Sequence, residues 1–362
     1  MNLQGLGYTT DFEREFTRIA DGNGDLVPAR IVREDRERFT AVTETGDVTL
    51  QLSGRFRHLT DRREDFPAVG DWVAAIASDD STGIIQQVLP RKSSFRRQMV
   101  GTGERAEAQV IAANVDTVFL VSGLDRDFNL RRIERYLTIA WDSGATPVIV
   151  LNKADLADDL DSIIADTGSV AIGVDILAIS AAQQSGIEQL TRYLRPGRTV
   201  ALLGSSGVGK STIVNALCGE QRMATRAVRE DDQRGRHTTT HRELIMLPSG
   251  GLLIDTPGLR ELQLWGDEDG LSRTFDDVES IAAGCKFRDC THDSEPGCAV
   301  MAALADGSLD RGRWESYQKQ QRELRFLARK QDRTLQQLEK DKWKKIHTQM
   351  RERYKKLGRH KR

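Results

Sequence analysis

The feature that most constrains the fold is an apolar strand that runs directly into a glycine-rich turn. The strand candidate is Val200–Leu203, and the turn after it leads to Lys210. Backbone N–H groups in such a turn can curl around an anion, and the next helix directs its positive end to the same place. The turn and the first helical residues are Gly204, Ser205, Ser206, Gly207, Val208, Gly209, Lys210, Ser211 and Thr212. The pattern predicts a phosphate-binding loop, with Lys210 on the outer phosphates and Ser211 on Mg²⁺.

A second loop carries the residue types that distinguish guanine from adenine. It follows the apolar run Pro147–Leu151 and consists of Asn152, Lys153, Ala154 and Asp155. The Asp155 carboxylate can accept from both guanine N–H donors, whereas adenine offers neither and would leave the carboxylate unpaired. We expect Asn152 to brace the neighbouring loops and Lys153 to cover one face of the base. Ser180 and Ala181 end another apolar run and can give a backbone N–H to guanine O6.

A third segment completes the predicted nucleotide pocket. Asp255 ends the apolar run Leu252–Ile254 and would hold Mg²⁺ through water, while the N–H of Gly258 would sense the third phosphate. The polar stretch 234–241 lies between this segment and the glycine-rich turn, and it suits a mobile loop whose threonine closes on Mg²⁺. Spacing does not settle which of the three threonines at 238–240 binds the ion; we favour Thr239.

The order of these loops is inverted, because the guanine loop precedes the phosphate loop. In ordinary GTP-binding proteins the phosphate loop comes first. Such pockets are built from loops at the carboxyl ends of parallel strands, so the chain order can be rotated while the loops stay in place. Between residues 99 and 278, strand candidates alternate with helical stretches, which predicts a mostly parallel α/β sheet. This range is the expected circularly permuted P-loop GTPase domain.

Two further units are expected before this domain. Residues 1–27 form a short arm with helical spacing of apolar residues. Residues 28–98 contain five short β-like runs separated by turn signals, which fits a small barrel of the oligonucleotide-binding (OB) type. Other small barrels share this pattern.

Cysteine usage predicts a metal site. Cys285, Cys290, His292 and Cys298 lie within 14 residues, inside the expected module 279–310. Three thiolates and one imidazole match a closed, structural Zn²⁺ site. Zn²⁺ is expected to supply much of the folding energy, because so short a module cannot build its own core. Clustered cysteines also argue against disulfides and for a reducing cytoplasm. Apolar runs are strand-length and no secretory signal is visible, so no membrane contact is expected.

Charge is distributed unevenly along the chain. Residues 311–362 read as a helical tail with 19 Lys/Arg against 6 Asp/Glu, whereas the rest of the chain has 34 against 48. A basic tail on an acidic body indicates a polyanionic partner, with nucleic acid the first candidate. The tail helix could equally serve a protein partner.

Taken together, these motifs resemble the circularly permuted GTPases of small ribosomal subunit biogenesis, the RsgA or YjeQ family. The resemblance covers about residues 28–310 and is most distinctive in Gly-Arg-His-Thr-Thr-Thr at 235–240 and in the cysteine spacing. It implies a cytoplasmic GTPase, expected to be a monomer, that is stimulated by the small ribosomal subunit and acts late in its maturation. Contacts to rRNA through the barrel, zinc module and tail are implied as well, with GTP hydrolysis to GDP driving release.

One residue departs from the common GTPase pattern. Leu259 follows Gly258, where many GTPases carry a glutamine that orients water. The resemblance points to His237 in the mobile loop as the substitute. The permutation also places Gly258 shortly before the cysteine cluster, and we expect the sensing of the γ-phosphate to pass to the zinc module through Leu259–Ile281.

Two alternatives remain at this point. The chain could be an RNA-binding assembly factor that holds GTP only as a structural ligand. It could instead be an ATP-using P-loop enzyme, in which Asn152–Asp155 matches the guanine loop by coincidence.

Overall fold

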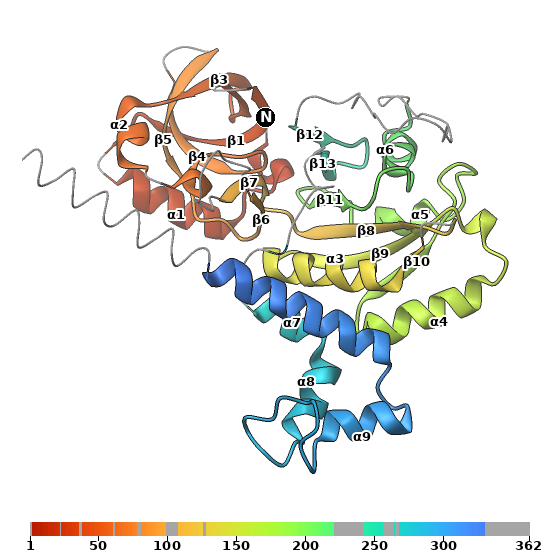
Figure 1. Ribbon diagram of the computed structural model, residues 1–362. Coiled ribbons are helices and arrows are strands. Elements are labelled where there is room, and N and C mark those ends of the chain that lie inside the picture. The colour runs from red at the N-terminus through yellow and green to blue at the C-terminus, as the bar shows by residue number, and fades with distance from the viewer. Residues whose placement is uncertain are drawn as a thin grey trace, which may run out of the picture.

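Figure 1 shows a β-barrel, a sheet covered by helices and a small helical module at the far end from the barrel. The computed structural model describes residues 2–21, 23–35, 38–60, 62–77, 81–98, 108–125, 128–220, 242–255, 264 and 268–329. The predicted fold class, with a barrel, a permuted GTPase domain and a C-terminal Cys/His cluster, is confirmed. The predicted domain boundaries remain predictions.

The barrel closes on itself. Its strands are β1 (Leu26–Asp35), β2 (Arg38–Val42), β3 (Asp47–Leu52), β4 (Trp72–Ala77) and β5 (Thr82–Val88). They are hydrogen-bonded in the order β1-β2-β3-β5-β4, and β4 pairs back onto β1. Side chains such as Ile31, Leu50, Val73 and Ile85 are fully buried inside. Helix α2 (Gly54–Leu59) and the 3-10 helix η2 (Arg63–Asp65) lie between β3 and β4.

The nucleotide domain is built on a parallel sheet. Its parallel strands are β8 (Thr117–Gly123), β9 (Thr146–Asn152), β10 (Asp175–Ala178), β11 (Thr199–Leu203) and β13 (Leu252–Asp255). They lie in the order β10-β9-β8-β11-β13, and β12 (Arg242–Met246) is added antiparallel to β13. The helices of this domain are α3 (Leu130–Ser143), α4 (Leu160–Val170), α5 (Glu188–Thr191) and α6 (Lys210–Cys218). Because parallel strands share one direction, their carboxyl ends meet at one edge of the sheet.

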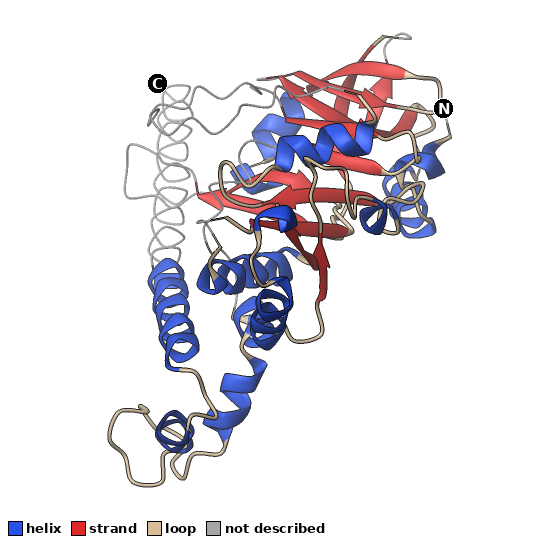
Figure 2. Ribbon diagram, turned by 90° about the vertical axis from the view of Figure 1, so that its right-hand side faces the viewer, coloured by secondary structure: helices blue, strands red, loops and turns tan. Residues whose placement is uncertain are grey.

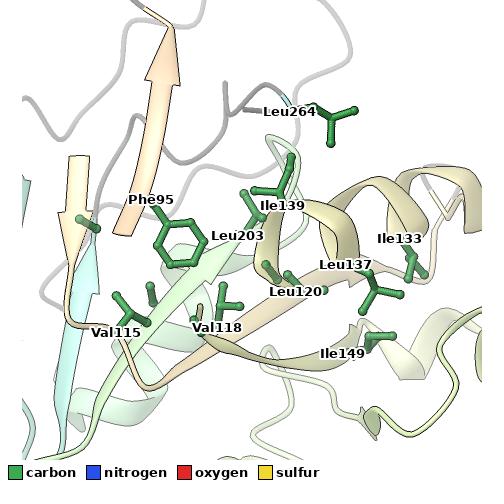
Figure 3. Packing of buried hydrophobic residues seen from close by; sticks show 14 of the residues in the cluster. Phe95, Val115, Val118, Leu120, Ile133, Leu137, Ile139, Ile149, Leu203 and Leu264 are labelled. Atoms are coloured by element: carbon green, nitrogen blue, oxygen red, sulfur yellow. The ribbon is translucent and has the colours of Figure 1, made fainter. Parts of the chain in front are cut away.

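Both faces of this sheet are buried, as the apolar strand sequences require. Along β8, Val118 and Leu120 face one cluster and Phe119 and Val121 the other, which is the two-residue period of a strand. Figure 3 shows the first face packed against α3, with Leu137 among the labelled contacts. Residues from α5 and α6 cover the second face.

The barrel is joined to the nucleotide sheet through its first strand. β1 pairs antiparallel with β12 at Arg33–Glu243 and Glu34–Arg242, so that the barrel and the parallel strands belong to one 11-stranded sheet. Strand β12 was not anticipated from the sequence, and neither was the separate hairpin of β6 (Ser94–Gln98) and β7 (Ala108–Ala113).

The N-terminal arm packs onto the barrel. It contains the 3-10 helix η1 (Leu3–Leu6) and helix α1 (Thr10–Ala20), in agreement with the helical spacing predicted there. The Tyr8 and Phe12 rings lie against Trp72 of β4, with ring centroids 4.7 and 6.0 Å away.

The C-terminal helices begin beside α3 and continue into the small module at the far end from the barrel. They are α7 (Asp269–Thr274), α8 (Asp276–Ala283), α9 (Ala299–Asp306) and a helix over residues 311–329. Figure 1 shows the last of these running beside α3, and Figure 2 shows it above the loops of the module that carries the Cys/His cluster. The predicted basic tail is therefore described only as far as residue 329, and residues 330–362 lie outside the described residues. No helix in the described ranges is long and apolar enough to cross a membrane.

Candidate nucleotide site and metal cluster

The glycine-rich turn has the local geometry that its sequence predicts. It joins the end of β11 to the start of α6, and Gly207 and Gly209 have φ angles of +84° and +96°. A Cβ atom at Gly204 would lie 2.3 Å from the carbonyl oxygen of Val121, and one at Gly209 would lie 2.2 Å from the Asn152 amide nitrogen. The left-handed backbone favours glycine at Gly207 and Gly209, and the close approach disfavours a side chain at Gly204 and Gly209.

Asn152 holds three of the predicted loops together. The side chain is 2% exposed; its Nδ2 donates to the carbonyl of Val208 (2.8 Å), and its Oδ1 accepts from the N–H of Ala181 (3.0 Å). One amide therefore connects the guanine loop, the phosphate loop and the segment that follows β10. Losing either bond would leave a buried polar group unsatisfied, at a cost of about 1–3 kcal/mol.

The remaining residues of the guanine loop lie at the same edge. Lys153 has a left-handed backbone (φ +63°), and its ammonium group forms an ion pair with Asp125, just beyond the end of β8. Asp155 lies in a short 3-10 helix, η3 (Ala154–Leu156), with its side chain exposed and accessible to a base. Ser180 is buried.

The phosphate side of the site is only partly described. Lys210 donates to the carbonyls of Gly204 (2.6 Å) and Ser205. Ser211 and Thr212 occupy the first turn of α6, while Asp255 ends β13 on the strand next to β11. Three further predicted residues lie outside the described residues: His237, Thr239 and Gly258. Part of the segment Leu259–Ile281, along which we expect the sensing of the γ-phosphate to pass, also lies outside the described residues.

The four predicted metal ligands converge. Their ligand atoms all lie within 4.8 Å of one another. Cys285 Sγ is 4.0 Å from Cys298 Sγ and 3.5 Å from His292 Nδ1, and Cys298 Sγ is 3.6 Å from the same nitrogen. Tetrahedral Zn–S bonds of about 2.3 Å would place two sulfur atoms about 3.8 Å apart. The cluster could therefore hold a metal ion of that size.

Backbone donors around the cluster favour thiolate ligands. Burial raises the pKa of Cys285, but the N–H groups of Val300 and Ala299, together with hydrogen bonds from the Cys290 and Cys298 thiols, lower the pKa overall. Burial, together with the neighbouring sulfur atoms of Cys298 and Cys285, raises the pKa of Cys290 to about 11. A bound cation would remove the proton from this last thiol, because thiolates rather than thiols ligate metal.

A carboxylate that the sequence analysis did not single out organises the ligand loop. Glu295 accepts from the hydroxyl and N–H of Thr291 and from the N–H groups of Asp293 and Ser294. These bonds lower the pKa of Glu295 to about 2. They close the turn around His292, which has a left-handed backbone with φ +60°.

The metal cluster is attached to the nucleotide domain by the helix over residues 311–329. The Trp314 ring meets the His292 ring edge to face, at 5.5 Å between centroids. The neighbouring Arg313 is buried and binds Asp277 of α8 (2.6 Å) and Glu134 of α3 (3.0 Å). Contacts therefore run from His292 through the helix over residues 311–329 to α3 of the nucleotide domain.

Comparison with known proteins decides the family. A sequence model described as RsgA GTPase matches residues 88–265, and one described as 50S ribosome-binding GTPase matches residues 199–360. The small ribosomal subunit biogenesis GTPase RsgA of Opitutus terrae is 49% identical, covering 99% of this chain and 100% of its own length. RsgA 1 of Oceanobacillus iheyensis is 50% identical, covering 96% and 99%. The chain belongs to the RsgA GTPase family. The predicted activity, GTP hydrolysis, is confirmed with it.

Solved structures of the RsgA kind agree with the fold. YjeQ from Thermotoga maritima matches with a TM-score of 0.60 and 28% identity, over 81% of this chain and 96% of that protein. YloQ, described as a circularly permuted GTPase, matches with a TM-score of 0.58 and 25% identity, over 86% and 96%. The inverted loop order of this RsgA family member is therefore a property of the fold and not a coincidence of motifs.

Proposed function

We propose that this GTPase acts in the biogenesis of the small ribosomal subunit, that the subunit stimulates its hydrolysis of GTP, and that hydrolysis to GDP drives release. The similarity to relatives named small ribosomal subunit biogenesis GTPases supports the first part. The single observation that carries the nucleotide assignment is the Asn152 side chain, which joins the guanine and phosphate loops. A cytoplasmic, monomeric enzyme fits this proposal.

The proposed chemistry is phosphoryl transfer to water. Lys210 would exchange its bonds with the turn's own carbonyls for bonds with the β- and γ-phosphates, and the N–H groups of residues 207–212 would surround the β-phosphate. The Ser211 hydroxyl would ligate Mg²⁺, and Asp255, on the strand next to β11, would hold the ion through water, with Thr239 as the further proposed ligand. When bound, Mg²⁺ supplies positive charge to the β- and γ-phosphate oxygens. His237 is the proposed group that orients water, since Leu259 cannot.

Contacts to rRNA are proposed for the barrel, the metal module and the basic tail. A barrel of the OB kind presents a face suited to oligonucleotides, and the described part of the last helix is already basic, with Arg322, Arg325 and Arg329 on it. We propose that the Cys/His cluster holds one structural Zn²⁺, because all four ligands come from the protein.

Hydrolysis of GTP, with ATP as control and with or without purified small subunits, tests the proposal. Turnover specific for GTP and raised many-fold by the subunit is the expected result, and replacing His237 with Ala should abolish the stimulation while leaving GTP affinity nearly intact. GTP-specific turnover without stimulation would remove the ribosomal part. Binding of GTP with no turnover under any condition would favour an RNA-binding factor that holds GTP as a structural ligand.

The guanine assignment has its own test in Asp155→Asn. The substitution replaces an acceptor by a donor, so we expect GTP affinity to fall at least about tenfold and xanthosine triphosphate to become the preferred ligand. Competition binding with GTP, ATP and xanthosine triphosphate measures the change. An unaltered preference would mean that Asp155 does not read the base, and use of ATP by the unsubstituted protein would point to the ATP-using alternative.

A further inference from the structure

Three arginines in the first turns of α3 have different partners. Arg131 and Arg135 lie four residues apart on one face and bind acids of the C-terminal region: Arg131 pairs with Asp310, and Arg135 forms two bonds of 2.7 Å with Glu323. Arg132 lies on the adjoining face and reaches the phosphate loop, where its Nη1 donates to Ser205 Oγ at 2.8 Å.

Ser205 lies between two cations. Its carbonyl accepts from the ammonium group of Lys210, and its hydroxyl accepts from the guanidinium group of Arg132. The hydroxyl of Tyr136, one turn further along α3, lies 3.5 Å from the same serine oxygen. The Arg132 charge is therefore held beside the residue from which Lys210 must separate in order to reach the phosphates.

We propose that Arg132 is a positioning residue of the nucleotide site, which fixes the start of the phosphate loop through Ser205 and adds positive charge that favours the triphosphate. The inference rests on the proposed nucleotide site and assigns it a residue outside the common GTPase motifs. Asn129 caps α3 by accepting from the Arg132 N–H (3.1 Å), which fixes the backbone from which this side chain extends.

Loss of the Arg132 charge and loss of its hydrogen bond to Ser205 should change nucleotide affinity in different ways. A guanidinium group stays protonated at all working pH values, so its electrostatic effect grows with the negative charge of the ligand. GTP carries more negative charge than GDP, so removal of the Arg132 charge should weaken the binding of GTP more than the binding of GDP. Loss of the Ser205 hydroxyl alone should affect both nucleotides equally, because the charge remains.

The experiment compares Arg132→Gln, Arg132→Lys and Ser205→Ala, with Arg135→Gln as the matched control that removes a cation one turn away. Affinities for GDP and for a non-hydrolysable GTP analogue are measured on the full chain, together with kcat and KM for GTP. We expect Arg132→Gln to lower the affinity for the GTP analogue about tenfold and the affinity for GDP by less, because a charge-assisted bond and a nearby charge are lost together. The KM for GTP should rise accordingly. Arg132→Lys should recover most of the affinity, and Arg135→Gln should leave both nucleotides unchanged.

Equal losses for GTP and GDP in Arg132→Gln, or affinities no different from those of Arg135→Gln, would overturn the proposal. Failure of Arg132→Lys to recover affinity would overturn the electrostatic part as well. Thermal melting of each variant shows whether it is folded. If Arg132→Gln folds poorly, the nucleotide affinities of Arg132→Lys and Ser205→Ala are compared instead, and they decide between the charge and the hydrogen bond. If the unsubstituted protein bound no GTP, the proposed function itself would fail, which is a separate result.

Discussion

The barrel and the metal cluster are both attached to the nucleotide domain, but by different kinds of contact. Backbone pairing of β1 with β12 joins the barrel, together with the ion pair between Glu34 and Arg242 (2.9 Å) and a bond from buried Arg30 of β1 to Thr199 Oγ1 of β11 (2.8 Å). Side chains join the metal cluster: buried Arg313 with its two acids, and Trp314 against His292. A backbone ladder tolerates many sequences, whereas a buried charge network fails when one partner is lost. The second attachment is the more sensitive of the two.

The largest expected effect is that of metal removal. Replacing Cys290 with Ser, or chelating the metal, should unfold the ligand loop, because structural Zn²⁺ contributes about 10–16 kcal/mol in small zinc-binding peptides at neutral pH. Hydrogen exchange in residues 285–298 should become fast while the barrel strands stay protected. Cys218→Ser, at the buried cysteine of α6, is the control and should keep the metal content. Unchanged exchange after complete metal loss would contradict the structural role.

The next effect concerns Arg313. Its replacement by Ala should destabilise the protein by about 3–5 kcal/mol, since buried Glu134 would lose one of its two cations and Asp277 would lose its partner. Arg325→Ala on the same helix is the control; its exposed contact with Glu268 (4.0 Å) contributes about 0.5 kcal/mol or less. Urea unfolding measures both, and equal losses would mean that the buried network is not what holds the helix.

The pH dependence of the Arg313→Ala variant gives a second check. Burial raises the pKa of Glu134 in the folded protein, although Ser316, Arg131 and Arg313 oppose it. A folded-state pKa above the unfolded value means that the folded state gains protons first, so stability rises as the pH falls through the folded pKa. We expect this rise to be larger in the variant, because one opposing cation is gone. A stability profile of the variant that rises no more than that of the unsubstituted protein, from neutral pH down to about 4.3, the ordinary pKa of a glutamate, would contradict the assignment.

The smallest effect is expected at the barrel junction. Glu34→Gln removes one charge from a largely buried ion pair but leaves the β1–β12 backbone bonds in place, so the loss should be about 1–3 kcal/mol and below that of Arg313→Ala. Urea unfolding again provides the measurement. A loss as large as that of Arg313→Ala would remove the distinction between the two attachments.

Local sequence patterns predicted most of the helices, strands and site residues. The features that they did not predict depend on contacts between residues far apart in the chain. Loops such as 204–212 and ligands such as Cys285 and Cys298 are close in sequence, so spacing alone places them together. Ser205 and Arg132 are 73 residues apart, and Lys153 and Asp125 are 28 apart. No periodicity connects such pairs, although Asp125 could have been noticed because it follows the end of an apolar strand.

Two other features were missed for the same reason. Strand β12 carries a mixed sequence, Arg-Glu-Leu-Ile-Met, whose strand character comes from pairing with β13 and β1 on either side. Trp314 lies in a basic helical stretch, and only the folded chain shows that its ring contacts the histidine of the cluster.

The pairing of β1 with β12 has a consequence for the nucleotide sheet as a separate unit. β12 is the last strand on its side of that sheet, and without the barrel its outer N–H and C=O groups would be unpaired. Free strand edges are templates for association between chains, and proteins commonly cover them. The barrel therefore also covers a strand edge that could otherwise pair with other chains. A fragment that begins after residue 88 should aggregate more readily than the intact chain, even if it still binds nucleotide.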